Sequence, residues 1–393
     1  MTKPTIPLVC ACGMLALALA ASAQPLPAGM TVEMSLEEAL GKMAMYQTGH
    51  SRLPISVVSD HIVTLQNRRD EKALRQFSYT LLGYLDAYWA GAEGKREIIR
   101  QLAKISGSEA VPALAKAVKD KDLWDMALLA LEDIPSREAD AALRELLSTS
   151  EGRARLGVIQ TLGLRGDPAS VGPLSRILAG DADTTARVTA ARALARIGGR
   201  SARAALLDSL DDPSDPVHRE LADAVMALAQ GMARSGDRSG AYRLYERLHR
   251  PAEPTTVRSA ALLGMLTTAG GSRAEKLWVQ SIHGDAEAQR IAVQAMTALT
   301  GRKTTAVMAS ELPKLPPTLQ AYVIAGLSAR SDREALPAVT TVVEKGVEEG
   351  APRSLPCAGR RRQRALLVAA LGAEDKATSA AVCASLIASP ARA

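Results

Sequence analysis

The sequence predicts an all-α solenoid, a superhelix of about eight antiparallel helical hairpins that follows an N-terminal helical cap. Three observations support this fold class. First, Ala and Leu recur throughout the 393 residues, whereas aromatic residues make up only 3%. Small aliphatic side chains favour close helix packing over a β-sandwich, which needs Val, Ile, Tyr and Phe in alternation. The other two observations are an internal repeat of about 32 residues and a glycine at a fixed place within it.

Each repeat begins with a marker residue near the start of its first helix. Apolar residues follow the marker at helical spacing, as Ala190, Ala191 and Leu194 follow Arg187. Steps between markers range from 29 residues (96 to 125) to 39 residues (219 to 258), where about seven extra residues lie around 232–240. Because one hairpin cannot bury its apolar stripe, neighbours are expected to stack into a continuous core. The markers are Arg96, Asp125, Arg155, Arg187, Arg219, Arg258, Arg290 and Gln320.

A turn separates the two helices of each hairpin. Glycine stands eleven residues after four of the markers, at Gly107, Gly166, Gly198 and Gly301. A helix that ends there needs a residue in the left-handed conformation, which glycine adopts without strain. Asp183, Pro254 and Asp285 precede first helices, where they suit helix capping and the first helical turn.

This pattern resembles the HEAT-repeat family, including its shorter HEAT-like variants, over residues 94–345. The features that carry the resemblance are the marker arginines at 155, 187, 219, 258 and 290, the Ala-Ala-Leu stripe after them and the turn glycines. Asp125 and Gln320 depart from the arginine pattern. The resemblance implies that the marker arginine pairs with a loop aspartate. It also implies that second helices line a concave face that holds proteins or peptides.

The first 23 residues read as a secretory signal peptide, with Lys3, an apolar run over 6–20 and cleavage between Ala23 and Gln24. A membrane anchor is the alternative, but the apolar run is shorter than the roughly 20 residues that a span requires. A lipoprotein box at Cys10 or Cys12 is disfavoured because the apolar run continues beyond it. We therefore expect a periplasmic or secreted protein without a membrane span after processing. With only Cys357 and Cys383 remaining, it is no disulfide framework.

Two segments flank the solenoid. After a linker at 24–34, residues 35–93 form the cap, with three helices expected at 36–47, 54–68 and 70–89. The third carries Phe77, Tyr79, Tyr84, Tyr88 and Trp89. These aromatic residues are interpreted as the sealing layer of the cap, with an aromatic binding surface as the alternative. Residues 346–393 are irregular and basic: either a loop for an acidic partner or, slightly favoured, the product of a disturbed reading frame.

Composition and motifs exclude several function classes. The net charge is +6, but Lys3 and five arginines within 353–364 account for it, and the rest of the chain balances. The repeats therefore offer no continuous basic face for nucleic acid. The five histidines lie in different units without a zinc motif, and no phosphate-loop or nucleophile motif occurs. We expect no catalytic residue, metal or cofactor.

The favoured function is an exported, non-catalytic scaffold or module that binds an unidentified protein or peptide, in an oligomeric state that the sequence leaves open. One alternative is the non-catalytic arm of a longer envelope protein with a catalytic or haem-binding domain downstream. Another, which export disfavours, is an enzyme similar to phycobilin lyases. The candidate binding face consists of charged residues expected on second helices: Glu109, Lys116, Lys119, Glu138, Arg144, Glu145 and Arg176.

Overall fold

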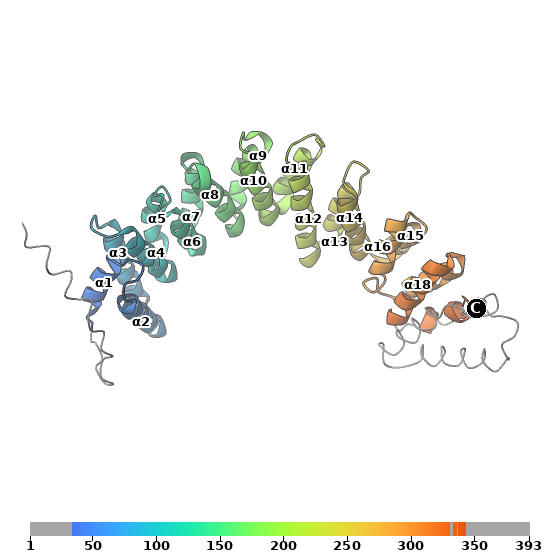
Figure 1. The fold of residues 1–393 in the computed structure, drawn as a ribbon, viewed down its shortest axis with the longest axis horizontal. Coiled ribbons are helices and arrows are strands. Elements are labelled where there is room, and N and C mark those ends of the chain that lie inside the picture. Colours follow the sequence, from blue (N-terminus) through green and yellow to red (C-terminus); the bar gives the residue numbers. More distant parts are fainter. Residues whose placement is uncertain (1–33, 331–332, 336, 343–393) are drawn as a thin grey trace, which may run out of the picture. The chain divides into compact units, whose positions relative to one another are not determined.

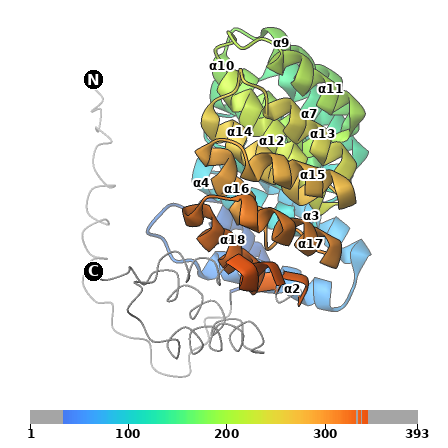
Figure 2. The ribbon, with the colours of Figure 1, turned by 90° about the vertical axis from the view of Figure 1, so that its right-hand side faces the viewer.

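The computed structural model describes residues 34–330, 333–335 and 337–342, and the chain divides into two compact units at Ala110 and Val111. Within the described residues all regular elements are helices (Figures 1 and 2), so the all-α prediction is confirmed. The expected signal peptide, nearly all of the linker and the basic segment at 346–393 lie outside the described residues.

The first unit contains the three expected helices and a fourth. Helix α4 packs against all three others, so it belongs to this unit, although the sequence assigned residues from 94 onward to the solenoid. Gly94 explains the close packing of α4 on α1, because a Cβ atom there would lie 2.0 Å from the Ala44 carbonyl oxygen. The elements are α1 Leu36–Ala44, α2 Leu53–Asn67, α3 Glu71–Asp86, α4 Ala92–Ile105 and the 3-10 turn η1 Ser108–Ala110.

The aromatic side chains of the first unit divide between core and surface. Phe77 is buried and packs edge-on against His61, with 4.8 Å between ring centroids. Tyr79 is 52% exposed and Tyr88 is 96% exposed. Trp89 is also exposed and contacts Tyr84 edge-on. Phe77 therefore belongs to the core of the first unit, and the interpretation of the cluster as a sealing layer is wrong for the exposed Tyr79, Tyr88 and Trp89.

The second unit is a stack of helices in two layers (Figures 1 and 2). First helices pack on one another in chain order, α6 on α8, α8 on α10 and α10 on α12, while second helices such as α9 and α11 form the other layer. The elements are α5 Val111–Ala117, α6 Trp124–Asp133, α7 Arg137–Thr149, α8 Gly152–Arg165, η2 Pro168–Ser170, α9 Val171–Gly180, α10 Thr184–Ile197, α11 Gly199–Leu210, α12 His218–Arg234, α13 Arg238–Leu248, α14 Thr255–Thr268, α15 Gly271–Ile282, α16 Ala286–Ala295, α17 Arg302–Glu311, η3 Leu312–Lys314, α18 Pro317–Arg330 and η4 Arg333–Ala335, with a further helical segment at 337–342.

Small residues permit the close approach of neighbouring first helices. Ala190, Ala191 and Leu194 of α10 are fully buried. A Cβ atom at Gly163 in α8 would lie only 2.6 Å from the Cα atom of Ala193 in α10. The low aromatic content thus has a direct structural cause, since bulkier residues would separate the helix backbones.

The turn glycines behave as expected at three of four positions. Gly166, Gly198 and Gly301 have positive φ angles of 69°, 67° and 109°. Gly107 does not, so the prediction is wrong there: helix α4 ends at Ser106 in extended conformation. The physical reason is a local alternative, because the Gly107 N–H donates to the Glu109 carboxylate at 2.9 Å.

Candidate functional site

Ion pairs join successive hairpins in the middle of the second unit. Arg155 of α8 donates to Asp181 in the loop before α10, with Nη2 and Oδ2 2.6 Å apart. Arg187 of α10 makes the same contact with Asp215 in the loop before α12. The hydrogen bond from Arg155 is the main reason that the pKa of Asp181 lies below its usual value. Pairing between a marker arginine and a loop aspartate is therefore confirmed for Arg155 and Arg187.

Burial shows why two of the other marker arginines, Arg219 and Arg290, do not form such pairs. The third, fourth and seventh residues after each of Arg155, Arg187, Arg258 and Gln320 are buried. We call a residue that stands in this relation to the buried residues of its helix the in-phase position. In α12 the buried residues are Leu221, Ala222 and Val225, and they place His218 in phase. Arg219 is thus one residue out of phase; it is exposed and makes no side-chain hydrogen bond within the described chain.

Arg290 is out of phase as well. The buried residues of α16, Ile291, Ala292 and Ala295, place Ala288 in phase. Arg290 is exposed and pairs with Glu287 one turn earlier, at 2.6 Å. Arg258 is in phase but forms no ion pair among the described residues, and its guanidinium donates to Thr255 Oγ1 at 3.4 Å. The implied arginine–aspartate pairing is therefore wrong for Arg219, Arg258 and Arg290.

We call these contacts between successive hairpins joints, and at the joint after α13 a histidine, His218, takes the place of the arginine. Its Nε2 atom lies 3.2 Å from Oε2 of Glu253, in the loop before α14. The Glu253 side chain is only 1% exposed. The separation of 35 residues equals the 28 residues between Arg187 and Asp215 plus the seven-residue excess of this unit. The excess therefore leaves the joint intact.

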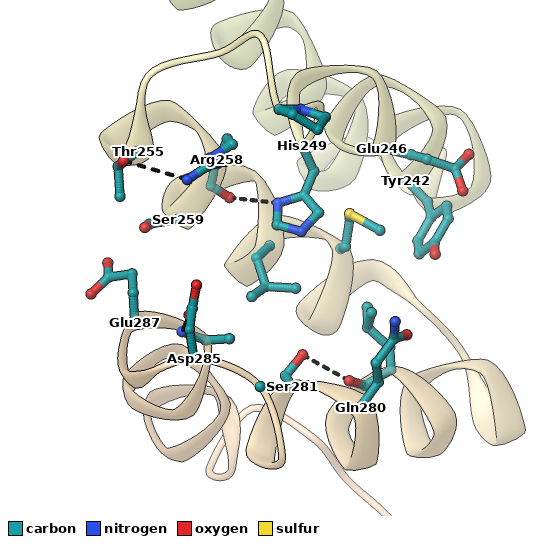
Figure 3. Close-up of a pocket in the computed structure, with 16 residues that line it drawn as sticks. Tyr242, Glu246, His249, Thr255, Arg258, Ser259, Gln280, Ser281, Asp285 and Glu287 are labelled. Carbon is teal, nitrogen blue, oxygen red and sulfur yellow. Dashed lines mark hydrogen bonds between the residues drawn. The ribbon is translucent and has the colours of Figure 1, made fainter.

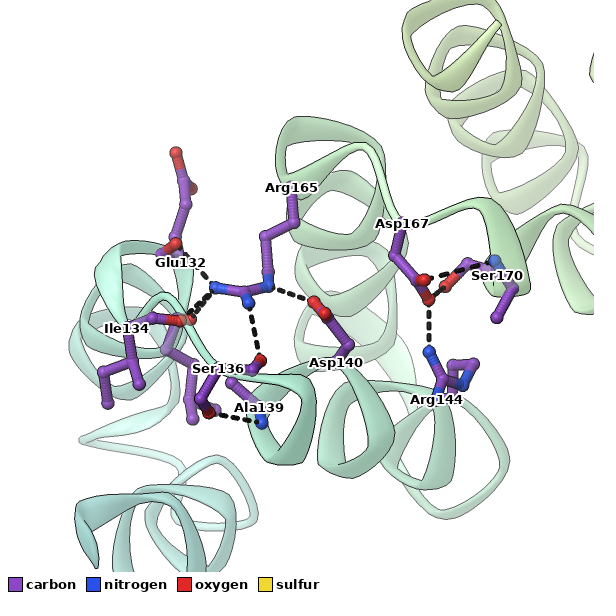
Figure 4. Close-up of polar contacts among 11 residues, drawn as sticks. Glu132, Ile134, Ser136, Ala139, Asp140, Arg144, Arg165, Asp167 and Ser170 are labelled. Carbon is purple, nitrogen blue, oxygen red and sulfur yellow. Dashed lines mark hydrogen bonds and ion pairs between the residues drawn. The ribbon is translucent and has the colours of Figure 1, made fainter. Parts of the chain in front are cut away.

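A second type of arginine contact was missed by the sequence reasoning. Arg165, the last residue of α8, is nearly buried and donates to four backbone carbonyls of the preceding hairpin as well as to Asp140 (Figure 4). Arg330 at the end of α18 makes the equivalent contacts with carbonyls after α16, including that of Met296. Arg165 lies ten residues after the in-phase residue Arg155, and Arg330 lies ten residues after the in-phase residue Gln320. An arginine at this spacing is the sequence signal that could have identified both. The carbonyls that accept from Arg165 are those of Leu131, Glu132, Ile134 and Ser136.

Glu109 and Arg144 of the predicted binding face form bonds within the protein. Glu109 lies in the first unit, and its carboxylate accepts from the Gly107 N–H. Arg144 pairs with Asp167, which also accepts from Ser170 at 2.7 Å (Figure 4). Burial raises the pKa of Asp167, but the hydrogen bonds from Ser170, Ala169 and Arg144 outweigh it and the net pKa is lowered. Neither Glu109 nor Arg144 is available as a simple surface charge.

The remaining predicted residues are exposed, and three of them share one register. Lys116 on α5, Glu145 on α7 and Arg176 on α9 each follow a fully buried leucine by two residues. The same register continues on α11, α13 and α15, after Leu206, Ala241 and Ala274. Lys119 and Glu138 are exposed outside this register. We call the six exposed residues the second-helix stripe: Lys116, Glu145, Arg176, Asp208, Arg243 and Lys276.

A groove opens among α13, α14, α15 and α16, with a volume of about 600 Å³ (Figure 3). Leu262, Met265 and Leu277 contribute its apolar lining. Its polar lining includes Tyr242, Glu246, His249, Arg258, Ser259, Gln280, Asp285 and Glu287. The imidazole Nδ1 of His249 lies 3.0 Å from the Arg258 carbonyl oxygen and ties the loop after α13 to α14. The groove is thus open to solvent and lined by both polar and apolar side chains.

Among the residues that the structure describes, no group of three or more His, Cys, Asp or Glu side chains is placed to hold a metal ion. In the same part of the chain, no helix is both long enough and apolar enough to cross a membrane.

A comparison with known families agrees with the repeat architecture. A family model described as HEAT repeats matches residues 141–229. The prediction of HEAT-like repeats is therefore confirmed for this stretch of the chain. The matched residues include both the Arg155–Asp181 and Arg187–Asp215 pairs and also Arg165, whose acceptors precede them. Among curated proteins, none matches the sequence.

Among solved structures, the human deoxyhypusine hydroxylase in complex with glycerol is similar to this chain, with a TM-score of 0.30 and 17% sequence identity. The similarity covers 71% of this chain and 96% of the hydroxylase chain.

Proposed function

We propose that this HEAT-repeat protein is an exported, non-catalytic scaffold that binds an extended segment of a partner protein along its second helices. The observation that supports this proposal is the second-helix stripe, in which six consecutive second helices present an exposed charge at one register. The first four charges alternate in sign, from Lys116 and Glu145 to Arg176 and Asp208. A surface that only needed solubility has no requirement for a shared register.

The spacing of the helices suggests the form of the partner. Packed helices lie about 8–10 Å apart, and an extended chain advances about 3.3 Å per residue. Every third residue of an extended segment therefore meets the next helix. A partner whose charges alternate in sign at every third residue complements the part of the stripe from α5 to α11.

Capture experiments with charge reversals test this function. The full-length, tagged protein is expressed in its native host and captured with its partners from the envelope fraction at low salt. We expect Glu145→Lys and Arg176→Glu each to weaken retention of the same partner at least tenfold. Arg153→Glu, an exposed reversal near the start of α8, serves as the control and leaves retention unchanged. Equal retention by all four proteins contradicts the proposal.

Export forms part of the proposal and has its own test. The signal sequence motivates it, and the mature protein is expected to begin at Gln24. Amino-terminal sequencing of the protein from the periplasmic fraction checks this expectation. An intact residue 1 in protein recovered from the cytoplasm overturns it.

A further inference from the structure

The groove among α13 to α16 lies where the repeat is longest. In-phase positions are separated by 32 residues from Arg155 to Arg187 and by 31 from Arg187 to His218, but by 40 from His218 to Arg258. The added length falls in the longer helix α12 and in the loop at 249–254, and that loop contributes Pro251 to the groove. The groove is therefore a local departure from regular stacking.

Arg258 is the feature of the groove that points to a ligand. It occupies the in-phase position at which Arg155 and Arg187 each hold a carboxylate. Its own donor contact within the described residues is the 3.4 Å bond to Thr255. An arginine fork with most of its donors unused is suited to bidentate binding of a carboxylate.

Neither of the nearby protein carboxylates, Asp285 and Glu287, forms an ion pair with Arg258 in this structure. Asp285 follows Arg258 by 27 residues, a spacing like that of the Arg155–Asp181 pair, but it accepts from the Ala288 N–H at 2.8 Å and caps α16. Glu287 is held by two bonds from Arg290, at 2.6 and 2.9 Å, which lower its pKa to about 2. Both acids lie across the groove from Arg258 (Figure 3). The carboxylate missing from this joint can therefore come from outside.

We propose that this groove binds the C-terminal carboxylate of a partner polypeptide whose last side chain is apolar. The inference rests on the proposed protein-binding function and names one end of the partner. The carboxylate meets the guanidinium of Arg258, and the last side chain packs on Leu262, Met265 and Leu277. Glu246, Asp285 and Glu287 on the rim disfavour further acidic residues and favour a basic residue upstream of the terminus.

Fluorescence anisotropy with the full-length protein tests this site. The probe is the fluorescein-labelled peptide Lys-Lys-Ser-Gly-Leu with a free carboxylate, and the matched probe is its C-terminal amide. We expect the amide to bind at least tenfold more weakly, because a charge-assisted bond contributes about 1.5–3 kcal/mol and 1.4 kcal/mol is tenfold in affinity. Arg258→Gln is expected to weaken binding of the free acid to the same extent and to abolish the difference between the probes.

Two further variants sharpen the test. Arg258→Lys keeps the charge but loses the planar fork, so it should lie between wild type and Arg258→Gln. Arg250→Gln removes the same charge from an exposed loop residue that does not line the groove, and it should bind like wild type. If Arg258→Gln fails to fold by circular dichroism, the comparison of acid and amide on the wild-type protein still decides the question.

Several outcomes overturn the inference. Equal binding of acid and amide, wild-type affinity of Arg258→Gln, or an equal loss in Arg250→Gln each contradict it. Binding of octanoate, measured by isothermal titration calorimetry, together with no binding of the free-acid peptide identifies a lipid-derived acid as the ligand and refutes the peptide terminus. The stripe variant Glu145→Lys should leave peptide affinity unchanged. If the free-acid peptide fails to bind while stripe variants still release a captured partner, this inference falls and the proposed function stands.

Discussion

His218 and Glu253 form the joint that Arg187 and Asp215 form one repeat earlier. The imidazole Nε2 lies 3.2 Å from the buried carboxylate, and Nδ1 lies 3.1 Å from the Asp212 carbonyl oxygen. A histidine ring is shorter than an arginine side chain, yet it reaches its acid because it stands at the first position of α12. The two repeats thus make the same kind of contact between hairpins with different residues.

This relationship predicts unequal effects for two neighbouring residues. His218→Ala leaves the Glu253 carboxylate buried without its side-chain partner, so we expect the free energy of unfolding to fall by about 1–3 kcal/mol. Arg219→Ala alters an exposed side chain and should change it by no more than about 0.5 kcal/mol. Urea denaturation followed by circular dichroism measures both. Equal losses would show that the in-phase position is Arg219 after all.

We expect the stability of the protein to be especially sensitive to substitution of Arg165, although this residue lies near the surface. Arg165→Ala removes the side-chain donor from four backbone carbonyls and from Asp140, of which the Ile134 and Ser136 carbonyls keep a backbone donor, and we expect a loss of about 2–4 kcal/mol in unfolding free energy. Arg165→Lys should recover only part of it, because an ammonium lacks the planar fork. Thermal and urea unfolding are compared with Arg153→Ala, a control that removes an exposed arginine from the same helix. A loss in the control as large as that in Arg165→Ala argues against this role.

Two glycines should respond to alanine with opposite signs. Gly163→Ala places a methyl group 2.6 Å from the backbone of Ala193, so α8 and α10 must separate and stability should fall by about 1–3 kcal/mol. Gly231→Ala, inside α12, meets no atom within 4 Å and should raise stability by about 0.5–1 kcal/mol. Differential scanning calorimetry of the two variants tests the prediction. Shifts of the same sign would contradict it.

Acid should weaken the joints. The pKa of Asp181 is lowered in the folded chain by the hydrogen bond from Arg155, and the pKa of Asp215 is lowered because hydrogen bonds from Arg187 and Val217 outweigh its burial. An unfolded aspartate has a pKa of about 3.9. The stabilisation is therefore complete above that value and is lost as the pH falls below about 4 through the folded pKa.

Urea midpoints between pH 6 and pH 2 measure this dependence. Asp181→Asn should be less stable than wild type at pH 6, and the difference should shrink toward pH 2. Asp223→Asn on α12 is the matched control, because its carboxylate makes no hydrogen bond within the described chain. A constant difference between wild type and Asp181→Asn across this range refutes the assignment.

Much of the fold could be predicted from the sequence because a repeat supplies the same signal several times. The period, the turn glycines at Gly166 and Gly198 and the caps at Asp183 and Asp285 are local features, and each is present in the structure. A local signal is reliable when the residues that satisfy it are close in the chain.

The sites were harder to predict because they depend on phase and on distant partners. Arg219 and His218 are adjacent, and only burial on both sides of α12 shows which of them faces the joint. Arg165 reaches carbonyls 29 to 34 residues earlier, and backbone carbonyls carry no sequence signal. The groove arises because one repeat is longer than the others. A sequence pattern averaged over all repeats does not show that difference.

The contacts of Arg165 also govern how this protein can be shortened. The donor belongs to one hairpin and the acceptors to the hairpin before it, so neither hairpin is a self-contained module. A deletion of one hairpin, with both ends in turns, would remove either Arg165 or the carbonyls that accept from it and leave the other without its partner. A shortened chain should therefore either keep both residues 131–136 and Arg165 or lose both, so that donor and acceptors are never separated.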